Sequence, residues 1–260
     1  MSSRRPRRFI LGVVGLLGLV LIVVLCVVFW VVLWAPNFSR GGTGPAVDTT
    51  QVEGIGSGVA SSSTAAPAPL PPAIIAPDAA RTLLATLPIK GRAPETGYGR
   101  TIQFGQAWID TDHNGCDTRN DILARDLTAI TRSGACKVLS GVLADPYTGE
   151  HIDFVRGNTT SAKVQIDHVV ALLDAWETGA QQLSATQRIA FANDPRNLLA
   201  VGGEINQAKG SGDAATWLPP NKTFRCAYVS RQIVVKAAYG LWVTQAEHDA
   251  MTRVLAACAG

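Results

Sequence analysis

The chain has 260 residues, of which 47% are hydrophobic and 17% are charged, and this length allows one well-packed core with appendages. Its formal net charge is +3, but four arginines stand in residues 1–8. Without the five arginines and two acids that precede Asp78, 18 basic and 18 acidic residues remain. The folded part is formally neutral, which excludes a basic field over its whole surface and leaves only a local patch for nucleic acid.

Residues 9–34 contain no charged side chain over 26 positions, more than the roughly 20 residues that a helix needs to cross a bilayer. Because the basic stub, residues 1–8, precedes this run, the positive-inside rule places the stub in the cytoplasm and the chain after Trp34 outside. We predict a single-pass signal anchor in the cell membrane. The alternative is a cleaved signal peptide and a secreted protein, although the run exceeds the usual ~7–15 residues and no clear A-x-A site follows.

Residues 35–77 are rich in Gly, Ser, Thr, Ala and Pro and carry only three charges. Such a segment cannot bury enough apolar surface to fold, so we predict a flexible linker. Residues 78–260 are then the one folded domain. Its first predicted elements are a helix over 78–87, which a proline stops, and a loop and strand over 98–108.

Residues 110–121 follow the pattern of an EF-hand calcium loop. Side chains with an oxygen atom occupy the first, third, fifth and twelfth places: Asp110, Asp112, Asn114 and Asp121. A glycine stands at the sixth place, but the twelfth residue is not the usual Glu and Cys116 occupies the seventh. The loop predicts either a bound Ca²⁺ ion or a tight Asx-rich turn that leads into a helix over 121–131.

Four cysteines lie beyond the apolar run: Cys116, Cys136, Cys226 and Cys258. An even number outside the cytoplasm favours two disulfides, and the absence of C-x-x-C spacing argues against a zinc ribbon. Three pairings exist, and we expect the local one, Cys116–Cys136 with Cys226–Cys258. Each bond would close a loop of about twenty to thirty residues and contribute ~3 kcal/mol.

Residues 137–155 predict a β-hairpin with a turn over 145–149, in which His151 and Asp153 face solvent. Helical stretches follow over 169–191, with Leu172 and Trp176 in the core. A further helix is expected over 229–243. The last helix should open at Thr244 with a capping box to Glu247.

Residues 163–170 predict a strand that ends with Asp167 and His168, and Asn197 begins a second apolar strand. After a Gly-Gly turn, a polar segment can open a helix with Asn206 at its start. This strand–strand–helix order can bring the four polar residues together. Oxygen ligands suit a hard divalent cation, and an imidazole can take a proton from water near neutral pH.

At these positions the chain resembles the HNH, or ββα-metal, nucleases. The resemblance implies that Asp167 and Asn206 hold Mg²⁺ or Mn²⁺, that His168 is the general base, and that Asn197 orients the loop. The step of nine residues from Asn197 to Asn206, with Lys209 after it, is similar to the HNH domain of CRISPR effector nucleases. Lys209 is therefore expected to affect turnover.

The wider frame resembles a secreted branch common in actinobacteria, related to the C-terminal domain of Gmr-type type IV restriction endonucleases. The segments that carry the resemblance are 166–172, 175–176, 193–195, 197–201 and 217–220. It covers roughly residues 98–258 and implies an α+β fold with a ββα-metal core, added helices and a β-hairpin.

Basic residues outside this motif are candidate phosphate contacts. Residues 214–246 hold four of them and no acid: Lys222, Arg225, Arg231 and Lys236. We predict that the last three form a stripe against the substrate and that Lys209 is a further phosphate contact. We also predict that Arg119 reaches the scissile phosphate, since the resembling family shares its Cys-Asp-Thr-Arg segment.

The predicted function is metal-dependent hydrolysis of a nucleic-acid phosphodiester, with DNA or RNA as substrate. No obligate protein partner is evident, and the membrane is reached through the N-terminal helix. The alternative is a non-catalytic envelope-tethered module that keeps the fold and binds nucleic acid or wall polymer. The set Asp167, His168, Asn197 and Asn206 favours the enzyme, because a binding role needs no base beside a metal site.

Overall fold

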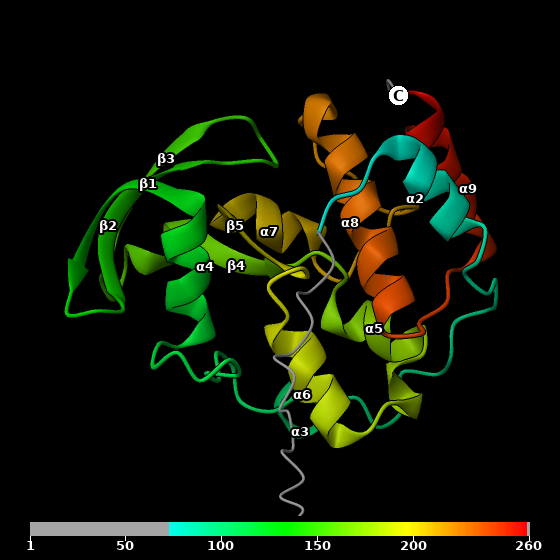
Figure 1. Cartoon of the computed structure of the whole chain (residues 1–260), viewed down its shortest axis with the longest axis horizontal. Helices are drawn as coiled ribbons and strands as arrows, with labels where there is room; N and C mark the ends of the chain where they lie inside the picture. Colours follow the sequence, from blue (N-terminus) through cyan, green and yellow to red (C-terminus); the bar gives the residue numbers. More distant parts are fainter. Residues whose placement is uncertain (1–72, 259–260) are drawn as a thin grey trace, which may run out of the picture. The chain divides into compact units, whose positions relative to one another are not determined.

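The structure is a computed structural model that describes residues 73–258. The predicted anchor over residues 9–34 and most of the predicted linker lie outside these described residues. No helix within them is long and apolar enough to span a membrane. The described chain has a mixed α+β fold, with two small antiparallel sheets and helices packed around them (Figure 1).

The first sheet has three strands in the order β1–β2–β3. Its strands are β1 (Leu127–Ser133), β2 (Lys137–Ala144) and β3 (His151–Val155). The predicted hairpin is confirmed, and His151 and Asp153 are exposed. The helix predicted over 121–131 is wrong at both ends: α4 (Thr118–Asp126) starts earlier, at the Asp117 cap, and stops where the β-branched residues of β1 favour a strand.

The second sheet is the pair β4 (Val164–His168) and β5 (Leu198–Gly202), which are antiparallel. It is followed by α7 (Gly203–Lys209), which gives the expected strand–strand–helix order. The helix begins at Gly203 and not at Asn206, so Asn206 lies inside it. A Cβ atom at Gly203 would overlap the carbonyl oxygen of Ala162, so this tight turn into α7 requires glycine.

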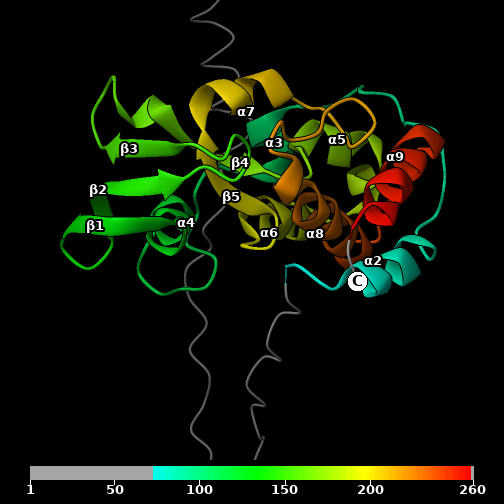
Figure 2. The ribbon, with the colours of Figure 1, turned by 90° about the horizontal axis from the view of Figure 1, so that it is seen from above.

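Strand β5 is buried on both faces, because α4 and the three-stranded sheet cover one face and the C-terminal helices cover the other. Leu198 and Ala200 pack with α4 and the three-stranded sheet, whereas Leu199 and Val201 pack toward α8 (Arg225–Ala238). The three-stranded sheet therefore lies on one side of the β4–β5 pair and α8 on the other (Figures 1 and 2). Two more helices pack on α8: α2 (Pro77–Leu84) and α9 (Gln245–Ala256).

The C-terminal helices differ from their predicted limits. Helix α8 starts at Arg225 and ends at Ala238, several residues before the helix predicted over 229–243. Helix α9 opens at Thr244, whose side chain accepts a hydrogen bond from the Glu247 amide. The predicted capping box is incomplete, because the Glu247 carboxylate pairs with Lys236 in the interior.

A third group of helices surrounds the loop that follows β4. These helices are α3 (Arg100–Phe104), α5 (Leu172–Glu177) and α6 (Ala185–Asn193). Leu172 and Trp176 are buried, as expected. The strand predicted within residues 98–108 is wrong: Phe104 is 1% exposed and packs among Trp176 and Phe191, and this burial favours the short helix.

Both expected disulfides are present, Cys116–Cys136 and Cys226–Cys258, with Cα–Cα distances of 5.2 and 5.9 Å. The first closes the acidic loop, where the Asp110 carboxylate accepts hydrogen bonds from two backbone amides. This is the Asx-rich turn expected as the alternative to an EF-hand. The loop does not gather three carboxylate ligand atoms within 4.8 Å, and calcium binding there stays a prediction.

Candidate active site

Asp167 lies at the end of β4 and is only 5% exposed. Its Oδ2 atom accepts a hydrogen bond of 2.5 Å from the Tyr147 hydroxyl, and its Oδ1 atom lies 3.0 Å from the Lys209 ammonium. Burial raises the pKa of Asp167 above its ordinary value, although the Lys209 charge and the Tyr147 hydrogen bond oppose this rise. The two buried donors fix the orientation of the carboxylate.

Lys209 is buried at the end of α7, with a side chain that is 0% exposed. Besides Asp167, its ammonium donates to the main-chain carbonyl of His168 at 2.9 Å. It therefore ties α7 to the end of β4. This burial excludes the surface contact between Lys209 and a phosphate that the sequence suggested, and the ammonium contacts Asp167 and the His168 carbonyl instead.

His168 is 6% exposed, and its Nε2 atom lies 2.8 Å from the carbonyl oxygen of Ala192. A carbonyl only accepts, so Nε2 carries the proton and Nδ1 keeps its lone pair. Burial, with the positive charge of Arg100, lowers the pKa of His168 from 6.5 to about 3. The imidazole is thus neutral at physiological pH and has one nitrogen free to accept a proton.

The Trp108 ring is nearly parallel to this imidazole, at a centroid distance of 6.3 Å and an angle of 16°. The backbone φ of Trp108 is 65°, a left-handed conformation that costs on the order of 1–3 kcal/mol for a bulky residue. This strained loop covers one side of His168.

Asn197 is fully buried and holds the loop that follows His168. Its side chain accepts from the amide of Val170 at 2.8 Å and donates to the Val170 carbonyl at 3.2 Å. Its own carbonyl accepts from the Val169 amide at 2.8 Å. These three bonds fix the backbone directly after the Asp-His pair.

A cavity of about 340 Å³ opens above Asp167 and His168. Asn206 of α7 lines it with them, and its amide nitrogen donates to Gln165 at 2.9 Å. That contact leaves the Asn206 oxygen available. Lys209 and Tyr147 contact Asp167 from the buried side and do not line the cavity. The lone pairs that Asp167 keeps and the Asn206 oxygen are hard oxygen donors, the kind of ligand that a divalent cation such as Mg²⁺ prefers.

The predicted basic stripe is not a surface feature. Arg231 is 8% exposed and donates to the carbonyls of Arg196 and Leu198, and Lys236 is 0% exposed. The prediction that these two contact phosphate is therefore wrong, because their charged groups have internal partners. Arg225 is half-buried, donates from Nε to the Pro219 carbonyl at 2.7 Å, and lines a separate groove.

Arg119 is also displaced from its predicted role. Its guanidinium donates to the Val164 carbonyl at 3.1 Å and lies 3.5 Å from the Ser161 carbonyl. Arg119 does not line the cavity above Asp167. It braces the start of β4 and is not placed against the scissile bond.

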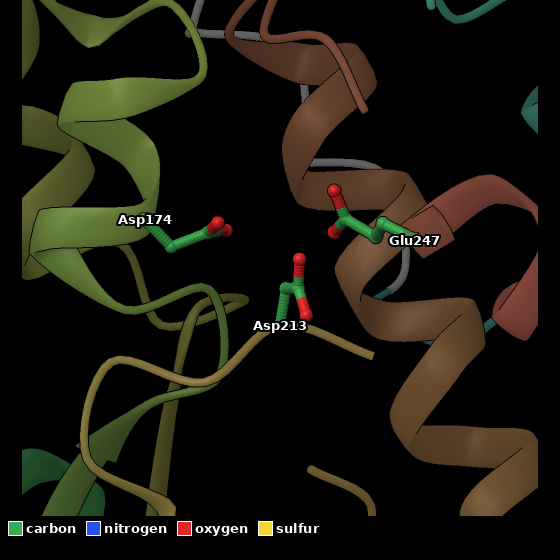
Figure 3. A group of neighbouring side chains, drawn as sticks. All are labelled: Asp174, Asp213 and Glu247. Atoms are coloured by element: carbon green, nitrogen blue, oxygen red, sulfur yellow. The ribbon is translucent and has the colours of Figure 1, made fainter. Parts of the chain in front are cut away.

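Three buried carboxylates converge elsewhere: Asp174 of α5, Asp213 after α7, and Glu247 of α9 (Figure 3). Among the described residues they are the one group of acids or histidines whose ligand atoms lie within 4.8 Å of one another. The Lys236 ammonium lies 3.1 Å from Asp174 and 2.8 Å from Glu247. The Arg92 guanidinium lies 3.1 Å from Asp174 and 2.7 Å from Asp213. These cations already occupy the carboxylates, so the group is a structural ion-pair network and not a metal site.

Sequence reasoning missed two residues of the site, Tyr147 and Arg100. Tyr147 lies in the hairpin turn, 20 positions before Asp167, and nothing in that turn indicates a contact with the carboxylate. Arg100 lines the cavity from α3, in a segment that the sequence predicted as loop and strand. Both contacts depend on tertiary packing.

A neutral imidazole, a buried carboxylate and an amide thus lie around one cavity. Residues 117–254 match the family described as GmrSD restriction endonucleases, C-terminal domain. The chain belongs to this family, which gives it a nuclease-related function. It is also 40% identical over 197 residues to a protein of Arthroderma benhamiae named "Uncharacterized secreted protein", covering 75% of this chain and 92% of that relative. No solved structure matches the chain.

Proposed function

We propose that the domain is a metal-dependent endonuclease of the HNH type that hydrolyses phosphodiester bonds of nucleic acid, with DNA as the first candidate substrate. The observation that carries this proposal is His168, a neutral imidazole that engages Ala192 through Nε2, keeps Nδ1 free, and lines a cavity with Asp167 and Asn206. The strand–strand–helix order of β4, β5 and α7 supports a ββα-metal core.

His168 Nδ1 would take the proton of a water that attacks the phosphorus in line. Asp167 and Asn206 would hold Mg²⁺ or Mn²⁺, which supplies charge stabilisation at the phosphate oxygens when bound. Tyr147 and Lys209 keep the Asp167 carboxylate in one orientation. Asn197 keeps the loop after His168 in place, so the base and the ligands are positioned before substrate arrives.

The deciding experiment is an in-gel nuclease assay on DNA and RNA with Mg²⁺ or Mn²⁺, repeated with EDTA. We expect cleavage that requires the metal and is lost in EDTA. Cleavage that persists in EDTA would contradict the metal role. Tight binding of nucleic acid or wall polymer without any cleavage would favour the non-catalytic envelope module.

Tyr147→Phe is expected to raise the Mg²⁺ concentration for half-maximal activity by roughly 10- to 100-fold, because a hydrogen bond to a charged carboxylate is worth about 1.5–3 kcal/mol. Tyr228→Phe is the matched control. Tyr228 is equally buried, and its ring lies 5.6 Å from that of Tyr147, but its hydroxyl contacts Gln232 and not Asp167. Equal Mg²⁺ requirements in the two variants would show that Tyr147 only packs.

We further propose that the domain works outside the cytoplasm, carried by the anchor predicted over residues 9–34. The two disulfides support this place, since such bonds persist in oxidising compartments. The name of the Arthroderma benhamiae relative also points to secretion. Protease treatment of intact cells, which should degrade the domain, checks the orientation.

A further inference from the structure

Arg100 stands at the mouth of the cavity above Asp167 and His168. It also lines a second, smaller cavity on the Trp108 side of His168, so it reaches both spaces that border the imidazole. It is the first residue of α3, and the buried Phe104 anchors this helix in the core. The packing of Phe104 therefore holds the backbone that carries Arg100.

The Arg100 side chain is exposed, and within residues 73–258 it makes no ion pair and no side-chain hydrogen bond. Arg119 and Arg231, by contrast, donate to backbone carbonyls. The site thus has a cation without a counter-ion.

The charges around the cavity favour an anionic ligand. Asp167 is paired with the buried Lys209, so the positive charge of Arg100 is left uncompensated. A guanidinium has five donors in a planar fork and pairs with two oxygens of a phosphate. We propose that Arg100 binds the nonbridging oxygens of the scissile phosphate, an assignment that rests on the nuclease function proposed above.

The match to the GmrSD C-terminal domain covers residues 117–254, so Arg100 and all of α3 precede it. The matched region supplies Asp167, His168 and Asn206, and the segment before it supplies the phosphate contact. The cavity is complete only when both parts of the chain fold together.

The test compares Arg100→Gln, Arg100→Lys and the control Arg132→Gln in the full chain. Arg132 is also exposed, on β1, and lines neither cavity at His168. We measure kcat and KM on DNA with Mg²⁺, and the salt dependence of DNA binding in EDTA. Arg100→Gln should lower kcat/KM by about 10- to 100-fold and reduce the slope of log K against log salt by about 0.9.

Arg100→Lys should keep the salt slope, because it keeps the charge, but should recover only part of kcat, because an ammonium cannot form the fork. Arg132→Gln should match wild type. If the wild-type protein cuts DNA and Arg100→Gln keeps its kinetics and its salt slope, the Arg100 assignment alone is overturned. The same holds if Arg132→Gln loses as much kcat/KM and salt slope as Arg100→Gln. A wild-type protein that cuts nothing would overturn the nuclease proposal and this one with it.

Discussion

His168→Ala is expected to lower kcat by about 10²- to 10⁴-fold, which is the usual contribution of a positioned general base. DNA binding should stay near wild type, because the imidazole is neutral and supplies no charge to the phosphate. His168→Gln is the sharper variant, since its amide nitrogen can take the place of Nε2 and donate to the Ala192 carbonyl, yet it provides no base. His151→Ala, at an exposed position of β3, is the control.

The pH profile gives a second readout of the same group. Because the pKa of His168 is lowered to about 3, the imidazole stays unprotonated across the neutral range. Its activity as a base is lost only as the pH falls toward that value, so no inflection from His168 is expected near its ordinary pKa of about 6.5. A variant His168→Gln with wild-type kcat on plasmid DNA would sink the assignment.

The sequence predicted the centre of the site better than its surroundings. Asp167 and His168 end one apolar strand, and Asn197 begins another, so strand pairing alone brings them together. The segment around Arg100 carries no such pattern. Helix α3 has five residues and no side-chain cap, and it forms because Phe104 is buried against side chains that are distant in sequence.

The predicted phosphate contacts of Arg231 and Lys236 were wrong for a different reason. A run with basic residues and no acid is usually a solvated face, and the sequence of residues 214–246 gives no sign of internal partners. Lys236 pairs with Glu247, 11 positions later, and with Asp174 on a different helix. A buried lysine cannot be told from an exposed one until the helices that carry its counter-ions are placed.

Lys236→Ala is expected to lower the free energy of unfolding by about 3–5 kcal/mol, because removing one partner leaves buried charges uncompensated. Lys236 and Glu247 are both 0% exposed, and Asp174 is 1% exposed, so water cannot replace the ammonium. For a domain of this size the melting temperature should fall by roughly 6–20 °C. Lys222→Ala, at an exposed position, should change stability by less than about 0.5 kcal/mol.

The pH dependence separates lost charge from lost packing. Burial raises the pKa of Glu247 to about 7, although the Lys236 charge acts in the opposite direction. A raised carboxyl pKa means that the folded state binds more protons than the unfolded state, so this group's contribution to stability falls as the pH rises from about 4.5 to about 7. Without Lys236 the pKa of Glu247 rises further. The loss of unfolding free energy in Lys236→Ala relative to wild type should therefore grow with pH.

Thermal melts of wild type and Lys236→Ala at pH 5 and pH 8 measure how far this stability difference increases with pH. The double variant Lys236→Met/Glu247→Gln should lose less than the two single changes together, because it removes both charges at once. A deficit for Lys236→Ala that is the same at both pH values would mean that the lysine stem only fills space.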